Sequence, residues 1–384
     1  FFIVILYMSD KTLISKILDY DDIWCNMLGI FNPYIDPFKT QFTSELPMYD
    51  IVAYRKYPIH NFVYDKLWIA KSQGLDCGEL ESLSIDSKVK YPIFIKPRWG
   101  HKSASSKNCF KINSFDEATP YLTKEDMIWT EFIDAQETMT DYIMLDGVVM
   151  YQMTLIYSEK QNGFIEDYKY ISEDNRPPHD IDEWVNKHMN GYSGICNVQY
   201  RGTKIIEVSL RLSRGGAYMK STNNTHLIEN INNVVEHGTW DYSYGKTMDY
   251  KPFYSFKCYT TSPILYLLPQ YLLDSVMSLY KCKPFYEYFF EPSGKRGMVF
   301  FQFLHKDFNK GMKCKQFLEH LFSLIQYIFI ILLMIVIVLL IIPTRSSFRN
   351  NVIIVFVVLY MTKVFNPLSA HYSLFKVQRQ QWFG

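Results

Sequence analysis

A short stretch in the middle of the chain, "GTKIIEVSLRLSRGGAY" (202–218), combines residue types that bind metal ions and phosphate. An apolar run, which we expect to be a strand, ends in Glu207, and Ser209 and Arg211 follow at two-residue spacing. Residues two apart on a strand lie on the same face, and carboxylate oxygens are ligands that Mg²⁺ prefers. The carboxylate, the polar residue beside it and the basic, glycine-containing loop that follows therefore predict a metal-phosphate site.

The elements that would position this site are predicted from residue 61 onward. In "NFVYDKLWIAKSQGL" (61–75), apolar residues recur near helical spacing and stop at Gly74, a residue type common just past a helix C-terminus. "YPIFIKP" (91–97) is typical of a buried strand that Pro97 ends. The small, polar loop that follows and a second strand, "CFKI" (109–112), predict a flap that can lie over phosphates.

Two β-hairpins are predicted further along the chain. "TMTDYIMLDGVVMYQMTLIY" (138–157) alternates in two runs around Asp146 and Gly147, and "ICNVQYRGTKIIEVSL" (195–210) does the same around Arg201 and Gly202. This half of the chain is therefore expected to be mostly antiparallel sheet with helices, an α+β arrangement.

Four segments, taken together and in order, resemble the ATP-grasp superfamily. They are similar to the ATP-grasp domains of D-alanine:D-alanine ligase and of the large subunit of carbamoyl-phosphate synthetase. The resemblance covers residues 61 to 218 and implies two α+β lobes that clasp a nucleotide. The segments are "YDKLWIAKSQGL", "YPIFIKPRWGHKSASS", "WTEFIDAQETMTDYIMLDG" and "GICNVQYRGTKIIEVSLRLSRGGAY".

The resemblance implies which residues contact the nucleotide phosphates. Lys66 and Lys96 match the family's two phosphate lysines, and the loop from Gly100 to Ser106 matches its flap. Within that loop, Ser103 and Ser105 are small enough to leave backbone N–H groups open to phosphate oxygens. The loop contains less glycine than the family's flap, which puts tight closure in doubt.

The same resemblance assigns residues to the base and the sugar. "TEFI" matches the hinge whose backbone pairs with the adenine edge, which places Glu131, Phe132 and Ile133 at the base, and Glu137 matches the acid that binds the ribose hydroxyls. Lys169, in "EDYKYISED", matches a third, catalytic phosphate lysine more loosely. An ordinary solvated charge is the alternative interpretation of Glu137 and of Lys169.

For the metal, the resemblance makes Glu207 the carboxylate that bridges two Mg²⁺ ions. Its partner on the adjacent strand is Asn197 or Gln199, which share one face and are both uncharged. Ser209 stands where the family has asparagine and would be a weaker ligand, whereas Arg211 keeps the arginine that stabilises an acyl phosphate.

Two functions remain open. The first is an ATP-dependent ligase that uses Mg²⁺, or Mn²⁺ in its place, to activate an unidentified small carboxylate as an acyl phosphate for attack by an amine or another nucleophile. The second is a degenerate nucleotide-binding protein without turnover, tethered to a membrane, which Ser209 and the glycine-poor flap favour. A protein kinase is set aside because the chain has no H-R-D or D-F-G motif.

The composition of the chain indicates which binding partners and which cellular compartment to expect. The net charge of +1, with no Lys/Arg cluster, argues against nucleic acid as a partner. The seven cysteines form no C-x-x-C pair and the nine histidines no H-x-x-x-H pair, which favours a reducing compartment and an oxygen-ligated metal. The protein is therefore expected in the cytoplasm or on the cytoplasmic face of a membrane.

The predicted organisation has five parts, with residues 1–7 expected to lie outside the folded protein. An entry lobe, interpreted as a reduced domain that precedes the ATP-grasp fold, comes before the two lobes themselves. An aromatic-rich segment that matches no motif and a hydrophobic tail follow. The boundaries are 8–60, 61–125, 126–240, 241–320 and 321–361.

The tail predicts a membrane helix. Residues 321 to 342 are interrupted only by Ser323, Gln326 and Tyr327, and such a helix would be about 33 Å long against a bilayer core of ~30 Å. A buried helix or a frameshifted, isoleucine-rich tail are the alternatives. A second apolar run, 352–361, is too short to span a bilayer alone.

Overall fold

The computed structural model describes residues 42–47, 50–84, 89–102, 108–158, 168–172, 176–212, 224–248, 252–260, 270–285 and 298–341. The chain divides into two compact units, a larger one built on residues 38–256 and a smaller one built on residues 257–303 and 309–378. Residues 1–41, which include most of the expected entry lobe, and the apolar run 352–361 lie outside the described residues.

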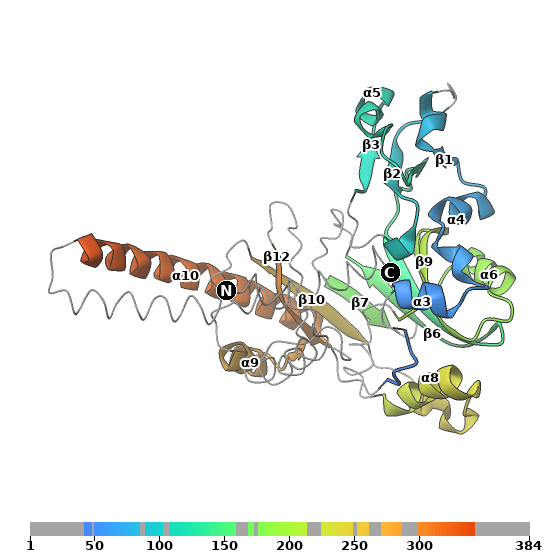
Figure 1. Cartoon of the computed structure of the whole chain (residues 1–384). Helices are drawn as coiled ribbons and strands as arrows, with labels where there is room; N and C mark the ends of the chain where they lie inside the picture. Colours follow the sequence, from blue (N-terminus) through green and yellow to red (C-terminus); the bar gives the residue numbers. More distant parts are fainter. Residues whose placement is uncertain are drawn as a thin grey trace, which may run out of the picture. The chain divides into compact units, whose positions relative to one another are not determined.

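A small sheet in the larger unit has four antiparallel strands in the order β1-β4-β2-β3 (Figure 1). Ile93 and Ile95 of β2 are fully buried in an apolar cluster with Trp129 of β4. Because successive side chains on a strand point to opposite faces, Lys96 lies on the face away from this cluster. The strands are β1 (Cys77–Glu79), β2 (Ile93–Pro97), β3 (Phe110–Ile112) and β4 (Met127–Glu131), with α5 (Phe115–Ala118) after β3.

A large sheet in the same unit runs in the order β10-β7-β6-β5-β8-β9. Asp146 and Gly147 have φ of 50° and 78°, which suits a tight two-residue turn between antiparallel strands. The β5–β6 and β8–β9 pairings confirm both predicted hairpins. The strands are β5 (Glu137–Leu145), β6 (Val148–Tyr157), β7 (Tyr168–Ser172), β8 (Gly194–Arg201), β9 (Lys204–Ser209) and β10 (Phe253–Thr260), whose first half belongs to this unit.

Helices cover one face of the large sheet. Tyr142, Val198 and Val208 form one buried cluster with Ile69 of α4 and Trp184 of α6. The other face of β5, β8 and β9 carries the polar side chains of the candidate site. The helices of this unit are α3 (Asp50–Lys56), α4 (Lys66–Ser72), α6 (His179–His188) and α8 (Thr225–His237), and two short 3₁₀ turns, Asn61–Tyr64 and Gly100–Lys102, flank α4 and the flap. The fold is therefore a mixed one of antiparallel sheets and packed helices.

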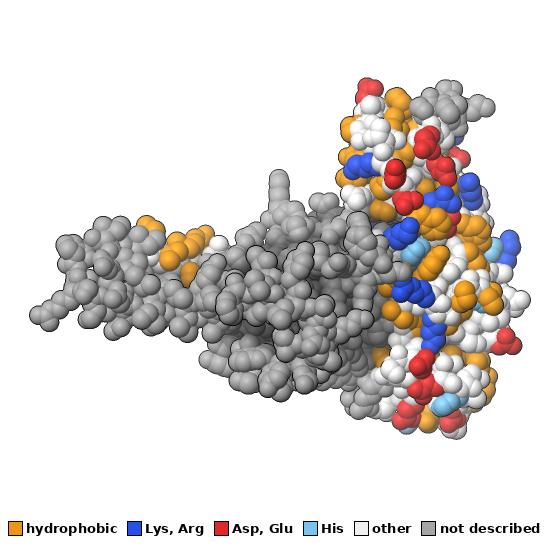
Figure 2. Space-filling view, in the orientation of Figure 1, with side chains coloured by type: hydrophobic (Ala, Val, Ile, Leu, Met, Phe, Trp, Pro, Cys, Tyr) orange, Lys and Arg blue, Asp and Glu red, His pale blue; other side chains and the backbone are white. Residues whose placement is uncertain are grey.

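The smaller unit contains α9 (Gln270–Leu279), β11 (Lys283–Phe285), most of β12 (Met298–His305) and nearly all of α10 (Phe308–Ile341). Leu318 and Phe322 of α10 are buried, whereas Leu324, Tyr327 and Ile331 are more than half exposed. Apolar side chains are visible on one short stretch in the place of this helix (Figure 2). Within the described residues, Phe308–Ile335 is one helix long and apolar enough to cross a membrane, and it begins well before residue 321.

Candidate functional site

Two buried lysines meet at the end of β9. Lys66 opens α4 and Lys96 lies in β2, and they are only 5% and 7% exposed. Lys66 Nζ lies 3.3 Å from Glu207 Oε1, and Lys96 Nζ donates to the carbonyl oxygen of Ile206 at 3.0 Å. The structure therefore brings together both predicted phosphate lysines and the predicted metal carboxylate.

The two lysines and Glu207 act on one another electrostatically. The pKa of Lys96 is lowered to about 8, mainly by burial and also by the nearby charge of Lys66, while Glu207 opposes the shift. Lysines are almost never fully buried unless they are paired. Two buried ammonium groups beside one carboxylate form a site that would be stabilised by an anion.

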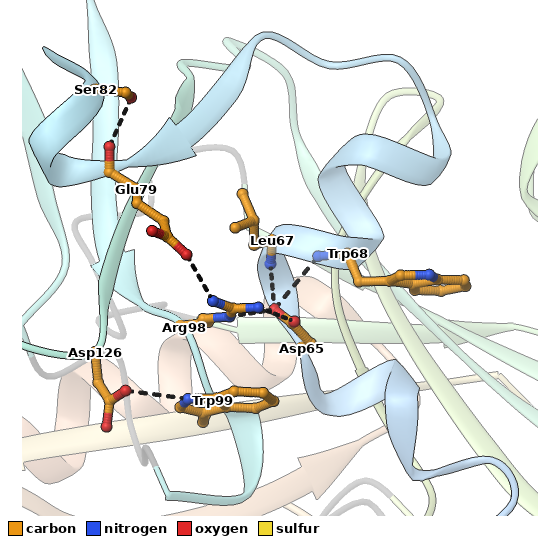
Figure 3. Close-up of polar contacts among 8 residues, drawn as sticks. All are labelled: Asp65, Leu67, Trp68, Glu79, Ser82, Arg98, Trp99 and Asp126. Atoms are coloured by element: carbon orange, nitrogen blue, oxygen red, sulfur yellow. Dashed lines mark hydrogen bonds and ion pairs between the residues drawn. The ribbon is translucent and has the colours of Figure 1, made fainter. Parts of the chain in front are cut away.

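Asp65, just before α4, contacts Arg98, just after β2 (Figure 3). This contact joins the segments that carry Lys66 and Lys96. Asp65 Oδ1 caps α4 by accepting from the backbone N–H groups of Leu67 and Trp68 at 3.0 and 3.4 Å. The same carboxylate pairs with Arg98 through Nε–Oδ1 and Nη2–Oδ2 contacts of 3.0 and 2.6 Å, and Lys66 N donates to Arg98 O at 3.0 Å. Asp65 was not singled out from the sequence, although an aspartate just before an apolar helical run is a recognisable N-cap.

Asp65→Ala is expected to destabilise the chain by about 2 kcal/mol, because it removes a helix cap and half of a bidentate ion pair together. Asp65→Asn keeps an acceptor for the cap and should cost about half as much. Thermal melts of the full chain measure both, with Asp116→Ala, at an exposed site, as the control. Equal losses for Ala and Asn would show that the cap contributes nothing.

The flap begins beside the carboxylate of Glu207. A methyl group added to Gly100 would lie 3.6 Å from Glu207 Oε1 and 3.3 Å from the ring of Tyr64, so a small residue suits the close approach. The buried ring of His101 stacks on Tyr54 with 3.8 Å between ring centres. This contact anchors the start of the flap to α3. Ser103 and Ser105 lie outside the described residues.

The predicted metal ligands share one face of the large sheet. Gln199 pairs in register with Glu207, and Asn197 pairs with Ser209, so all four side chains lie on the same face. Asn197 Nδ2 donates to Asp141 Oδ1 at 2.7 Å, and both residues are 1% exposed. Asp141 is a further acidic residue of this face that was not predicted, although it follows Glu137 at a same-face spacing within one strand.

This set of oxygen donors fits a hard cation in part. Carboxylate, amide and hydroxyl oxygens suit Mg²⁺ or Mn²⁺. Among the described residues, however, no three His, Cys, Asp or Glu side chains form a cluster that could hold a metal ion. The face would therefore hold Mg²⁺ through Glu207 and neutral oxygens, and phosphate oxygens would have to supply the remaining negative charge.

Arg211 is held by a residue of the expected entry lobe. Its Nη2 pairs with Asp50 Oδ2 at 2.7 Å and its Nη1 donates to Leu212 O at 2.9 Å. Burial lowers the pKa of Arg211, but the ion pair with Asp50 outweighs this and the net shift is upward. Tyr64 links the same groups, since its hydroxyl donates to Asp50 at 3.3 Å and accepts from Leu210 N at 3.0 Å. Sequence patterns missed Asp50 because it lies 161 residues from Arg211.

The predicted hinge and ribose residues lie where β4 passes into β5. Glu131 N donates to Asp76 O at 2.8 Å and Phe132 N to Pro92 O at 3.3 Å, which fixes the hinge backbone to the small sheet. Glu137 Oε2 pairs with Arg201 Nη2 at 3.0 Å. Ile133 follows in the loop between the two strands.

Cys109 lies within electrostatic range of both groups of residues. It directly precedes β3, whose first residue, Phe110, pairs with Ile95. Burial raises the pKa of the Cys109 thiol, and the charges of Lys66, Glu207, Lys96 and Glu137 all act on it. The backbone of Lys169 pairs with Tyr157 in the large sheet, but its side chain lies outside the described residues.

No protein-family model matches the sequence, and no curated protein matches it. Solved structures do resemble the chain. An L-amino acid ligase from Bacillus licheniformis is 13% identical with a TM-score of 0.45, over 67% of this chain and 71% of that one. An N5-carboxyaminoimidazole synthase from Aspergillus clavatus, in complex with ADP and an aminoimidazole ribonucleotide, is 11% identical with a TM-score of 0.48, over 70% of this chain and 78% of that one.

A third similar structure is the biotin carboxylase domain of 2-oxoglutarate carboxylase from Hydrogenobacter thermophilus, with ADP, magnesium and bicarbonate. It is 9% identical with a TM-score of 0.43, over 65% of this chain and 63% of that one. All three identities are below 25% and all three TM-scores are below 0.5, so these structures assign no residue role to this chain.

Proposed function

We propose that the chain binds ATP with Mg²⁺ and activates a small carboxylate as an acyl phosphate. The observation that carries the proposal is a pair of buried lysines beside Glu207: Lys66 Nζ lies 3.3 Å from Glu207 Oε1, and Lys96 Nζ lies 3.0 Å from the carbonyl oxygen of the preceding residue, Ile206. Burying two ammonium groups close together is costly, and such a pair is expected where an anion binds. A triphosphate supplies that anion, and the adjacent oxygen-rich face suits the cation that accompanies it.

Each predicted residue has a role in this proposal. Lys66 and Lys96 hold the phosphates, and the backbone of Glu131 to Ile133 faces the adenine edge. Glu137, oriented by Arg201, accepts hydrogen bonds from the ribose hydroxyls. The face made by Glu207, Gln199, Asn197 and Ser209 would hold Mg²⁺, or Mn²⁺ in its place, which supplies charge neutralisation to the phosphates when bound. Lys169 and the flap serines Ser103 and Ser105 are proposed to complete the phosphate contacts.

The reaction follows from this arrangement. A carboxylate oxygen of the substrate attacks the γ-phosphorus, the bond to the β,γ-bridging oxygen breaks, and ADP leaves. Arg211, whose guanidinium pairs with Asp50, donates hydrogen bonds from its other N–H groups to the acyl phosphate. An amine or another nucleophile then attacks the acyl carbon and expels inorganic phosphate. The protein acts through positioning and through charge placed in a site shielded from water.

The direct test is ADP release by the full chain in detergent, with ATP, Mg²⁺ and a panel of amino acids, peptides and small carboxylic acids, each with ammonia or an amine as acceptor. Release that depends on both a carboxylate and an acceptor is expected. ATP binding without ADP release on any substrate would instead favour a nucleotide-binding protein without turnover, the alternative that Ser209 supports. A chain that does not bind ATP would contradict both.

We further propose that α10 anchors the protein in a membrane, with the nucleotide site on the cytoplasmic side where ATP is available. Leu324, Tyr327, Ile331 and Met334 are each more than half exposed, and a continuous apolar helix in water is unfavourable in free energy. A bilayer is the environment that covers all sides of such a helix.

The full chain should therefore sediment with cell membranes and resist extraction by carbonate. The double substitution Ile328→Asp/Ile331→Asp should shift most of the protein to the soluble or aggregated fraction, because acidic residues at mid-span are costly in lipid. Leu279→Asp, at an exposed leucine outside α10, is the control and should leave the protein in membranes. Recovery of the wild-type chain in the soluble fraction would contradict the proposal that α10 is a membrane anchor.

A further inference from the structure

The turn that ends α9 carries a lysine in a conformation that usually belongs to glycine. Lys281 has a φ of 56°, in the left-handed region that residues other than glycine rarely adopt. The turn is closed in the Schellman pattern, in which Cys282 N donates to Met277 O at 2.9 Å. The second hydrogen bond of that pattern joins Lys281 N to Ser278 O at 3.0 Å. Glycine would form the same turn without strain, so the turn itself does not explain the lysine.

An exposed apolar side chain lies at the same turn, beside α10. Leu279 is 82% exposed. The next residue, Tyr280, contacts Phe317 of α10 with 5.9 Å between ring centres, and Phe317 is itself 45% exposed. The turn is therefore held against α10 and adds apolar surface next to that helix.

The turn meets α10 at the edge of the proposed membrane span. Charged residues such as Lys310, Lys313 and Glu319 are costly in hydrocarbon, so the lipid-covered part of α10 begins after them, near residue 321. Phe317 precedes that residue by about 6 Å of helix rise, and the headgroup region on each side of a bilayer is about 5 to 7 Å thick. Phe317 and the turn beside it therefore lie at the depth of lipid headgroups.

Three exposed side chains near this contact are basic. Lys281 and Lys283 belong to the turn and to the strand after it, and Lys313 lies on α10 one helical turn before the aromatic contact. The carboxylate of Glu319, in contrast, is paired with Lys315 Nζ at 2.7 Å. Apolar side chains flanked by exposed lysines match an anionic membrane surface, where both kinds of group find a favourable environment.

We propose that the turn of Leu279, Tyr280 and Lys281 binds anionic lipid headgroups on the side from which α10 enters the bilayer. Its leucine enters the boundary between headgroups and acyl chains, and its lysine contacts the phosphate and carboxylate groups of the lipids. The proposal rests on the proposed membrane anchor and adds a second attachment outside α10. Because α10 alone keeps the chain in membranes, loss of this contact changes how the smaller unit lies on the bilayer without releasing the protein.

The test measures the depth of residue 279 in vesicles that contain the full chain and lipids brominated near the headgroup. Leu279→Trp places a fluorophore at the turn, and brominated lipid should quench the added fluorescence more strongly with phosphatidylserine present than in phosphatidylcholine alone. Asn309→Trp, at an exposed residue of α10 about 18 Å before residue 321, is the matched control and should not be quenched. Equal quenching at the two positions would show that the turn faces water or another protein, and would overturn the contact.

Lys281→Gly separates the lipid contact from the fold. Glycine relieves the left-handed conformation, so the melting temperature in detergent should not fall. In phosphatidylserine vesicles the loss of one lysine should lower the ratio of bound to unbound turn about fivefold, measured as weaker quenching when Lys281→Gly is combined with Leu279→Trp. Undiminished quenching would contradict the role of the lysine.

Extraction by carbonate distinguishes this proposal from the anchor on which it rests. A wild type that resists carbonate, together with a Leu279→Trp variant that brominated lipid does not quench, would overturn the contact and keep the anchor. A wild type that carbonate extracts from membranes would overturn both.

Discussion

Replacing Lys96 with Met is expected to abolish the thermal stabilisation that MgATP gives the full chain, while the nucleotide-free protein stays at least as stable as the wild type. A ligand at a hundred times its dissociation constant stabilises the folded state by about 2.7 kcal/mol, and the loss of a buried phosphate contact should remove most of this. The fold, by contrast, gains when a buried charge is deleted. A pKa lowered from 10.5 to about 8 corresponds to about 3 kcal/mol of unfavourable burial, and the lost hydrogen bond to Ile206 O is worth about 1 kcal/mol.

The pH dependence gives an independent check on the same residue. The folded-state pKa of Lys96 is about 8, below the 10.5 of an ordinary lysine. Between these values the unfolded chain binds a proton that the folded chain does not, so the free energy of unfolding of the wild type rises with pH relative to Lys96→Met. The stability advantage of the variant should therefore be largest below pH 8 and should shrink as the pH rises toward 10.5.

Melts of the wild type and of Lys96→Met at neutral and alkaline pH, each with and without MgATP, measure both effects. Lys90→Met, at an exposed lysine three residues before the buried part of β2, is the matched control and should keep the full response to MgATP. Undiminished MgATP stabilisation of Lys96→Met would show that this lysine does not hold the phosphates.

The parts of the fold that the sequence predicted well are those that local chemistry decides. The turn at Asp146 and Gly147 needs two residues with positive φ between alternating strands, and this pattern can be read within a few residues. The helix that begins at Lys66 and the strand that carries Lys96 were likewise visible from their apolar periodicity. The phosphate-binding role of the two lysines was predicted from the order of the four segments along the chain. Local patterns alone do not assign such a role.

The contacts that hold the site together were not predictable, because they join residues far apart in the chain. Asp50 pairs with Arg211, Arg201 with Glu137, and Asp65 with Arg98 across separations of 161, 64 and 33 residues. No spacing rule links such partners in a single sequence. Each ion pair depends on how the strands and helices pack. The charge of one residue alone does not indicate which of the many opposite charges in the chain is its partner.

The residues on the proposed metal-binding face of the sheet differ from the expected pattern, and their surroundings also depend on how the strands pack. Asn197, Gln199 and Ser209 are neutral, whereas additional negative charge would strengthen metal binding. The carboxylate of Asp141 accepts a hydrogen bond from Asn197 and is not the register neighbour of Glu207. Among the described residues, the carboxylate of Glu207 both contacts Lys66 and lies on the face of the other proposed metal ligands. Its removal should be more damaging to turnover than the loss of any neutral neighbour.

Glu207→Gln is accordingly expected to lower ADP release at saturating Mg²⁺ by about 100-fold or more, because it withdraws the carboxylate proposed to hold the metal in a site where placed charge dominates the rate. Ser209→Asn should act in the opposite direction and raise ADP release, since an amide oxygen reaches further toward the cation than a hydroxyl does. Ser209 is 3% exposed, so the larger side chain must fit against Asn197, its register partner. Thermal melts separate a failure to pack from a failure to activate.

The matched control for the charge removal is Glu125→Gln, at an exposed glutamate outside the site, which should leave both ADP release and the melting temperature unchanged. An inactive wild type that binds MgATP, together with an active Ser209→Asn variant, would identify Ser209 as the residue that prevents turnover. An active wild type whose rate is indifferent to Glu207→Gln would contradict the metal role of Glu207. The close contact with Lys66 would then serve only to neutralise a buried charge in the phosphate site.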